Sequence, residues 1–160
     1  MRRRDFLGSL SIPLVTGIGG CLDSNPVFSE AITLGAVLLE NHDPNASHQF
    51  DVRVKRDGRT VHDGSYRIKP RPPERIPTEF VDCTWEDERG EYSIAARIDG
   101  GRWGEYDVHD GAESESDCVV SSVQRIRWME GNARPNFETF AICNQLDAGE
   151  THGAPCPRYQ

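Results

Sequence analysis

Cysteine and histidine are the residues of this chain that could most readily bind a metal. The chain has five of each, and metal sites built from them have recognisable spacings. It contains no Cys-x-x-Cys and no His-x-x-x-His. Cys143 and His152 faintly resemble a blue-copper loop, but their gap is too long and Met129 precedes the cysteine. The sequence therefore predicts no metal centre and no other cofactor.

The histidines are expected to have no shared role. His48 and His62 fall on opposite sides of one expected hairpin, where we expect an ordinary surface pair. The remaining three are interpreted as solvated loop residues: His42, His109 and His152.

Catalytic motifs are absent from the sequence. There is no Gly-x-Ser-x-Gly nucleophile elbow and no phosphate-binding glycine loop, so we predict a protein that is not an enzyme and name no catalytic residue. One acidic cluster could bind calcium weakly, but its irregular spacing favours a solvated loop. Its members are Asp110, Glu113, Glu115 and Asp117.

The first 21 residues have the layout of an export signal. Three arginines, Arg2 to Arg4, precede a weakly apolar stretch that ends in Gly19, Gly20 and Cys21. That stretch is too short to span a bilayer as a helix, and small residues of this kind precede signal cleavage sites. This order of arginines, apolar residues and small residues predicts that residues 1–20 are removed.

Two motifs in this segment resemble known export signals. Arg3-Arg4-Asp5-Phe6-Leu7 resembles the twin-arginine consensus, in which the matching positions are Arg3, Arg4, Phe6 and Leu7. Ile18-Gly19-Gly20-Cys21 resembles a lipobox, with Ile18 where leucine is more usual. The resemblance implies folding before export, cleavage before Cys21 and a lipid on its thiol, which would hold the protein at the extracytoplasmic face of the cell membrane.

The expected mature chain is strongly acidic. Loss of residues 1–20 removes three arginines and one aspartate, so 18 basic residues become 15 and 26 acidic residues become 25, for a net charge of −10. Lysine is scarce, with only Lys55 and Lys69, and this balance resembles the proteins of salt-loving archaea. Nucleic acid is excluded as a partner because phosphate contacts require clustered positive charge.

Short alternating apolar runs separated by turn residues predict an all-β chain. A nearly continuous apolar run, Ala31 to Glu40, is expected to be buried on both faces. Asp57-Gly58 and Asp99-Gly100-Gly101 are expected hairpin turns, with a bulge at Asp63-Gly64. The remaining expected strands are 48–56, 59–68, 75–85, 92–98, 102–108, 118–128 and 137–143. About eight strands favour a two-sheet antiparallel sandwich.

A seven-residue motif refines this expectation. Glu88-Arg-Gly-Glu-Tyr92-Ser-Ile94 resembles the tyrosine-corner segment of immunoglobulin domains, with Ile94 in place of the cysteine. The resemblance implies an immunoglobulin-like sandwich in which the Tyr92 hydroxyl turns back to the preceding loop. Residues 48–108 also resemble β-sandwich domains of small haloarchaeal lipoproteins of unknown function, which implies no catalytic residues.

The four remaining cysteines are expected to form disulfides after export. A hairpin centred between Glu130 and Gly131 puts Cys118 opposite Cys143, within disulfide reach. Cys83 and Cys156 are then left to pair, which would tie the tail to the body.

Two further surface features have modest expected roles. Asn45-Ala46-Ser47 is a glycosylation sequon in an expected turn. Three tryptophans are interpreted as core and rim of the sandwich rather than a carbohydrate platform: Trp85, Trp103 and Trp128.

The expected organisation is a signal peptide (1–20), a lipidated tether (21–29), a sandwich domain (30–145) and a tail (146–160). The function expected is binding or display on the cell surface, toward an envelope protein or a transporter. The alternative, a small extracytoplasmic metal or redox protein, would require free thiols at Cys83, Cys118, Cys143 or Cys156.

Overall fold

The computed structural model describes residues 31–112, 117–126, 134–140, 143 and 156. The expected signal and tether, with Arg3, Arg4, Phe6, Leu7, Gly19, Gly20 and Cys21, lie outside these ranges. So do Glu113, Glu115, Trp128 and His152. No helix in the described ranges is long and apolar enough to cross a membrane.

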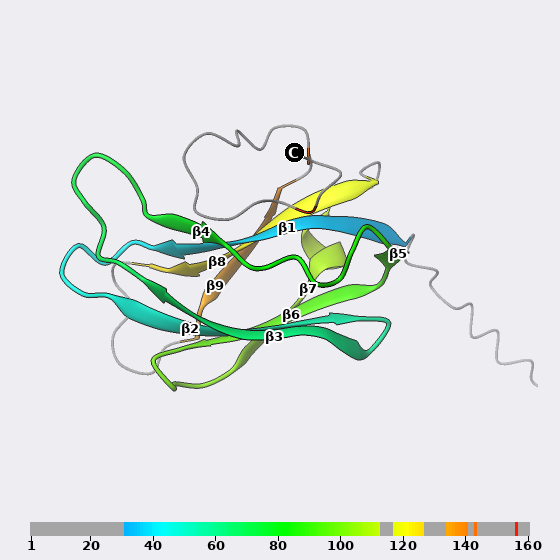
Figure 1. The fold of residues 1–160 in the computed structure, drawn as a ribbon, viewed down its shortest axis with the longest axis horizontal. Coiled ribbons are helices and arrows are strands. Elements are labelled where there is room, and N and C mark those ends of the chain that lie inside the picture. Colours follow the sequence, from blue (N-terminus) through cyan, green and yellow to red (C-terminus); the bar gives the residue numbers. More distant parts are fainter. Residues whose placement is uncertain (1–30, 113–116, 127–133, 141–142, 144–155, 157–160) are drawn as a thin grey trace, which may run out of the picture.

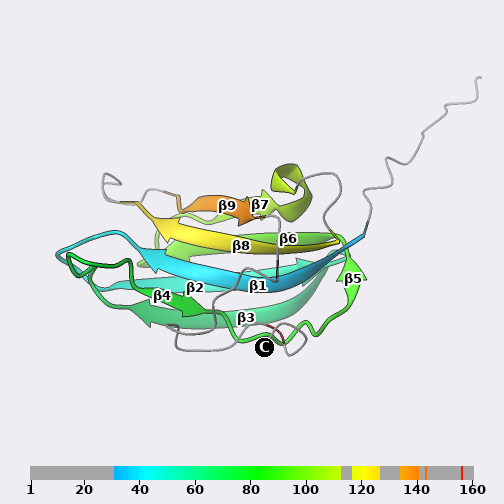
Figure 2. The ribbon, with the colours of Figure 1, turned by 90° about the horizontal axis from the view of Figure 1, so that it is seen from above.

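The protein is an all-β sandwich of two facing sheets (Figures 1 and 2). One sheet has the order β4-β1-β8-β9 with β5 also paired to β1, and the other has the order β3-β2-β6-β7. A short 3-10 helix, η1 (Val108–Gly111), follows β7. The strands are β1 (Ile32–Asn41), β2 (His48–Arg56), β3 (Arg59–Ile68), β4 (Thr78–Phe80), β5 (Arg89–Gly90), β6 (Tyr92–Ile98), β7 (Gly104–Asp107), β8 (Cys118–Arg125) and β9 (Asn136–Phe140).

Strand β1 is buried on both faces, as its continuous apolar run predicts. Leu34, Val37 and Leu39 point into the core between the sheets, where their exposed fractions are zero. Ala36 and Leu38 point to the other face and pack with Phe80, Val120 and Cys143. The sheet therefore has an apolar layer on each side of its central strand.

The pairing of β1 with β8 corrects the expectation of a wholly antiparallel sandwich. Leu34 lies opposite Val119 and Leu39 opposite Val123 in a parallel register that shifts between Leu34 and Ala36. Because β7 ends the second sheet, the chain crosses through η1 to the first sheet before β8 begins. That crossing makes the parallel pairing possible.

The β2–β3 hairpin has the predicted turn but a different bulge. Asp57 and Gly58 have positive φ angles of 50° and 74°, as a two-residue turn requires. The register shifts so that Val61 is the additional residue, whereas Gly64 pairs regularly with Val52. Gly64 is needed for a different reason: a Cβ there would lie 2.8 Å from His62 Nε2.

The strand expected over residues 75–85 is also corrected. Only Thr78–Phe80 pairs with β1, because the chain then turns inward to bury Trp85. The Trp85 ring is 1% exposed, and its Nε1 donates a hydrogen bond to the Leu34 carbonyl at 2.6 Å. The prediction of Trp85 as a core residue is confirmed.

Both disulfides have the predicted pairing, Cys118–Cys143 and Cys83–Cys156. The register of β8 and β9 differs by one residue from the expected hairpin, since Val120 lies opposite Phe140. The Cα atoms of Cys118 and Cys143 are nevertheless 5.9 Å apart, within the range that a disulfide spans. Cys156 also joins β1, since its backbone N–H donates to the Gly35 carbonyl at 3.0 Å.

The tyrosine corner is present at the start of β6. Tyr92 is 1% exposed and its hydroxyl donates to the Glu88 carbonyl at 2.6 Å. Arg56 lies beside this corner and donates to the Trp85 carbonyl at 2.8 Å. Burial raises the pKa of the Tyr92 hydroxyl.

We predict that Tyr92→Phe lowers the free energy of unfolding by about 1 kcal/mol, because it removes one buried hydrogen bond and leaves the ring in place. Urea denaturation measures this as a lower midpoint at an unchanged slope. An unchanged midpoint would show that the Glu88 bond contributes nothing to stability.

Candidate functional site: the loop end of the sandwich

The sandwich has two ends that differ in what they carry. We call the end where β1 begins the base; it includes residues 31, 56–59, 84–92, 107–112 and 117. We call the opposite end the loop end; it includes residues 41–47, 69–77, 99–103, 125–126 and 134–135. The two ends are roughly 30 Å apart along β1, at the usual rise per residue of a strand.

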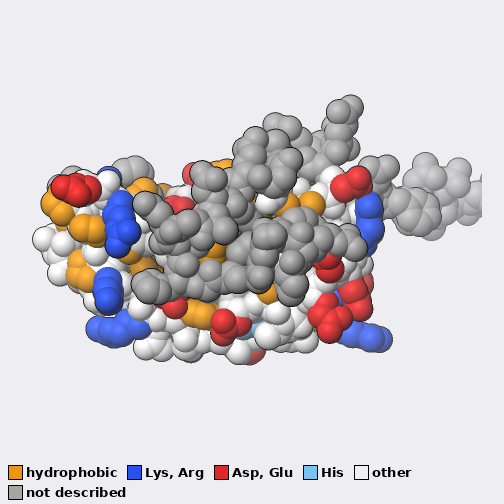
Figure 3. Space-filling model, turned by 45° about the horizontal axis from the view of Figure 1, so that its top comes forward, with side chains coloured by type: hydrophobic (Ala, Val, Ile, Leu, Met, Phe, Trp, Pro, Cys, Tyr) orange, Lys and Arg blue, Asp and Glu red, His pale blue; other side chains and the backbone are white. Residues whose placement is uncertain are grey.

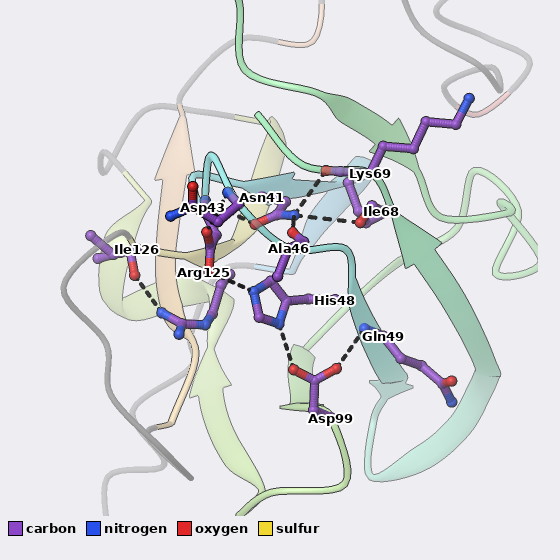
Figure 4. Close-up of polar contacts among 11 residues, drawn as sticks. Asn41, Asp43, Ala46, His48, Gln49, Ile68, Lys69, Asp99, Arg125 and Ile126 are labelled. Carbon is purple, nitrogen blue, oxygen red and sulfur yellow. Dashed lines mark hydrogen bonds and ion pairs between the residues drawn. The ribbon is translucent and has the colours of Figure 1, made fainter. Parts of the chain in front are cut away.

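Asn41, the last residue of β1, organises the loop end. Its side chain is fully buried, and its Nδ2 donates to the carbonyls of Ala46 and Lys69, each at 2.8 Å, with a longer contact of 3.4 Å to the Ile68 carbonyl. Its Oδ1 accepts from the Asp43 backbone N–H at 2.9 Å. One side chain therefore fastens the 42–47 loop to the beginning of the proline-rich 69–77 loop (Figure 4).

His48 joins the same loop to the turn between β6 and β7. Its Nδ1 lies 2.5 Å from Asp99 Oδ2 and its Nε2 lies 3.0 Å from Asp43 Oδ2. Both ring nitrogens therefore face carboxylate oxygens, and both can donate when the ring carries its second proton (Figure 4). Asp99 itself has a φ of 50° and accepts from the Gln49 backbone N–H at 2.9 Å.

The two carboxyl groups beside His48 have shifted pKa values. The pKa of Asp43 lies below its usual value of 3.8, chiefly because the carboxylate accepts the Asn45 backbone N–H and also contacts His48. Burial raises the pKa of Asp99, but the Gln49 backbone N–H and His48 outweigh it, so that this pKa is also lowered from 3.8. Both groups therefore stay ionised in the folded protein to lower pH than in the unfolded chain.

A hollow of about 420 Å³ lies between the two loops that Asn41 joins. Its lining comes from both loops and is His42, Pro44, Arg71, Pro72 and Pro73. The loops are also joined by a hydrogen bond from the Arg71 backbone N–H to the Asp43 carbonyl at 2.7 Å. His42 is held by its backbone N–H bond to the Arg125 carbonyl and by a 3.1 Å contact from its Nε2 to Glu40. The walls of the hollow are thus set by the fold before any ligand arrives.

Basic side chains gather at the loop end of this acidic protein. Its described residues include six basic side chains against three acidic ones: Lys69, Arg71, Arg75, Arg102, Arg125 and Arg134 against Asp43, Glu74 and Asp99. The base has the opposite balance, with eight acidic side chains against three basic ones: Asp57, Glu86, Asp87, Glu88, Glu91, Asp107, Asp110 and Asp117 against Arg56, Arg59 and Arg89. In Figure 3 the acidic side chains accordingly gather at the right of the molecule, near the base.

The histidines named from the sequence lie in different surroundings from those expected. His48 and His62 do not form a surface pair, because His48 lies opposite Ile68 and His62 opposite Val54, and both are only 8% exposed. His62 packs against Trp85 and bonds to Tyr66 and Thr84. Burial lowers the pKa of His62.

The histidines expected to be solvated are also more enclosed than predicted. His42 lines the hollow. The Nε2 of His109 is buried and has no hydrogen-bond partner among the described residues.

The other sequence-derived sites are not brought together. Asn45 is exposed in the 42–47 loop, beside the hollow, where a glycan can be accommodated. Asp117 pairs with Arg89 at 3.0 Å. Trp103 lies against Arg53 and Arg97, with 5.1 and 4.9 Å from each guanidinium carbon to the ring centre. Within the described ranges, no group of three or more His, Cys, Asp or Glu residues could hold a metal ion.

Comparison with known proteins adds no assignment: no family model, no curated protein and no solved structure matches this chain.

We predict that Asn41→Leu lowers the free energy of unfolding by about 3 kcal/mol, because it leaves two partly buried carbonyls and one partly buried N–H without their partner. Asn45→Leu is the matched control: it makes the same change at an exposed position of the same loop and should cost less than about 0.5 kcal/mol. Urea denaturation measures the free energy of unfolding of both variants, and an equal decrease in the two would contradict the role given to Asn41.

We also predict that stability falls in acid in a way that depends on Asp99. Because its folded pKa is lowered, the stability it contributes is present above pH 3.8 and is lost as the pH falls through the folded value. Asp99→Asn tolerates the positive φ, so it should flatten the pH dependence of the unfolding free energy between pH 5 and pH 2. An equal pH dependence of the unfolding free energy in the wild type and in Asp99→Asn would refute the contribution of Asp99 to this acid sensitivity.

Proposed function

We propose that this protein is a non-enzymatic, lipid-anchored binding module of the extracytoplasmic face of the cell membrane, and that it binds its partner with the loop end. The observation that supports the proposal is that the two ends of the sandwich differ in charge and shape. Its basic, hollowed end lies opposite the end where β1 begins, directly after the tether that the sequence predicts (Figure 1).

The proposed anchor and the proposed binding surface are compatible in space. A lipid on Cys21 would connect to the base through the tether of residues 21–29, since Ile32 is the first residue of β1. The loop end would then face away from the membrane, where a second envelope protein or a transporter could reach it.

The charge distribution also supports an acidic partner. A basic patch on an otherwise acidic molecule attracts partners of the opposite sign and orients them during encounter. The loops that carry this patch are fixed by Asn41 and His48, so little conformational entropy is lost when a partner binds.

The cysteines favour this proposal over the metal or redox alternative. That alternative needs free thiols, whereas Cys83, Cys118, Cys143 and Cys156 are joined in two disulfides. Each bond is expected to stabilise the fold by about 2–4 kcal/mol. Paired cysteines are usual in proteins outside the cytoplasm.

The anchor is tested with Cys21→Ser in a host that exports the full chain. Wild-type protein should fractionate with membranes and have a mass that begins at Cys21 plus lipid, whereas the variant should not carry the lipid. A matched Arg3→Lys, Arg4→Lys variant should remain unprocessed in the cytoplasm. Wild-type protein without lipid, recovered from the soluble fraction, would refute the anchor.

The binding surface is tested by placing a photo-crosslinking amino acid at Glu74 on the loop end or at Asp110 on the base, both of them exposed. In membranes that hold the anchored protein, the Glu74 position should give a discrete crosslinked species and the Asp110 position should not. Crosslinks from Asp110 alone, or from neither position, would contradict binding through the loop end.

A further inference from the structure

The hollow at the loop end contains an arginine whose side chain has no partner among the described residues. Arg71 is only half-exposed, and among the described residues no carboxylate, hydrogen-bond acceptor or aromatic ring contacts its side chain. The other half-buried arginines of the described ranges have partners: Arg53 pairs with Asp63 at 2.8 Å, Arg97 pairs with Asp51 at 2.8 Å, Arg56 donates to the Trp85 carbonyl at 2.8 Å and Arg125 donates to the Ile126 carbonyl at 2.6 Å. An unpaired guanidinium on the wall of a hollow is a ready site for an anion, because its fork of N–H donors matches a carboxylate.

Three exposed proline rings form the apolar part of a lining that is otherwise largely polar. Pro44, Pro72 and Pro73 present saturated rings, which pack against aromatic or aliphatic groups and have no N–H to satisfy. The volume of about 420 Å³ lies in the range of sites for small organic molecules. A hydrophobic group with one acidic group therefore fits both the size and the chemistry of this lining.

The loops that line the hollow are held in place by hydrogen bonds and prolines, so the hollow can discriminate between ligands of different shape. The Arg71 backbone is fixed to Asp43, and Asp43 is fixed in turn by His48 and Asn41. Proline at positions 70, 72 and 73 restricts the backbone around Arg71 further. Three acidic groups lie beside the lining in the chain: Glu40 is occupied by its contact with His42, Asp43 is occupied by its contact with His48, and Glu74 is exposed.

We propose that this hollow binds a carboxylate carried on an apolar body, with the Arg71 guanidinium on the carboxylate and the apolar part against the proline rings. This rests on the proposed function and names the chemistry that the loop end recognises. The same chemistry is offered by a free organic acid and by an acidic segment of a partner protein.

The test is a titration of the folded domain followed by backbone amide NMR at low salt. The probe is N-acetyl-phenylalanine, which has a free carboxylate and a ring; N-acetyl-phenylalanine amide is the matched probe without the charge. We expect the acid to shift the signals of His42 and Arg71 in a saturable way and the amide to bind at least tenfold more weakly. Equal shifts by both probes would overturn the assignment.

The matched variants are Arg71→Gln and Arg75→Gln, which remove one charge each from the same loop. Arg75 is exposed and does not line the hollow. Arg71→Gln should weaken binding of the acid about tenfold or more, whereas Arg75→Gln should change it less than about threefold. Equal losses in both variants would mean that the loop attracts anions without a specific site, and would overturn the proposal.

A third probe separates the two sources of the carboxylate. The peptide acetyl-Gly-Phe-Asp-Gly-amide offers the acidic group on a side chain within a chain. Tighter binding of this peptide than of N-acetyl-phenylalanine supports an acidic protein segment as the ligand, and tighter binding of the free acid supports a small organic acid.

If crosslinking from Glu74 succeeds while every probe fails, the assignment of the hollow is wrong and the binding function stands. Binding of the probes without any crosslink from Glu74 would reject the partner on the membrane and retain the hollow.

Discussion

Burial of β1 on both faces is the constraint on which the rest of this structure depends. A strand that is apolar on each side cannot lie at the surface of a two-layer sandwich unless something covers its outer face. The inner side chains, such as Leu34 and Leu39, are covered by the second sheet. The outer side chains lie in a second cluster that contains Phe80, Val120 and Cys143. Both disulfides join segments that contact β1 or its neighbour β8, and they hold this covered arrangement together.

The same strand places the candidate site. The apolar run of β1 ends at Asn41, where the chain must leave the sheet and satisfy its backbone polar groups. Asn41 does this from within the protein, through the carbonyls of Ala46 and Lys69. His48, at the beginning of the next strand, connects Asp43 to Asp99. Buried polar groups that are fully paired give a unique local structure, and here they define the walls of the hollow.

Charge then gives the two ends of the sandwich different properties. A largely acidic surface keeps such a protein soluble and disfavours nucleic acid. Against that background, the basic residues of the loop end create a local field that an acidic partner would meet. Among the described basic residues of this end, Arg71 is the one that is half-buried and has no described partner, and for this reason it is the residue to which we assign recognition.

Local patterns in the sequence predicted those parts of the fold that depend on near neighbours along the chain. Alternation in residues 48–56 and the Asp57-Gly58 turn predict the β2–β3 hairpin, because side-chain direction and turn geometry are properties of a few adjacent residues. The tyrosine corner is equally local, since Tyr92 bonds to Glu88 only four residues away. The disulfide pairing also followed from the sequence, because four cysteines allow few pairings and one hairpin excluded most of them.

Tertiary structure alone decided the features that join distant segments. The parallel pairing of β1 with β8 joins residues about 85 positions apart, as in Leu34 and Val119, and no local pattern specifies such a neighbour. His48 and His62 looked like surface residues because hairpin position says nothing about which loop or ring will cover a side chain. Arg71 is distinguished by the absence of a described partner, and a sequence does not reveal which charges will meet. The sequence by itself determined most of the strands, the hairpin turn at Asp57-Gly58 and the charge of this protein, because these are set by local chemistry. Only the folded chain decided where the charges and polar side chains come together, because that depends on contacts between residues far apart in sequence.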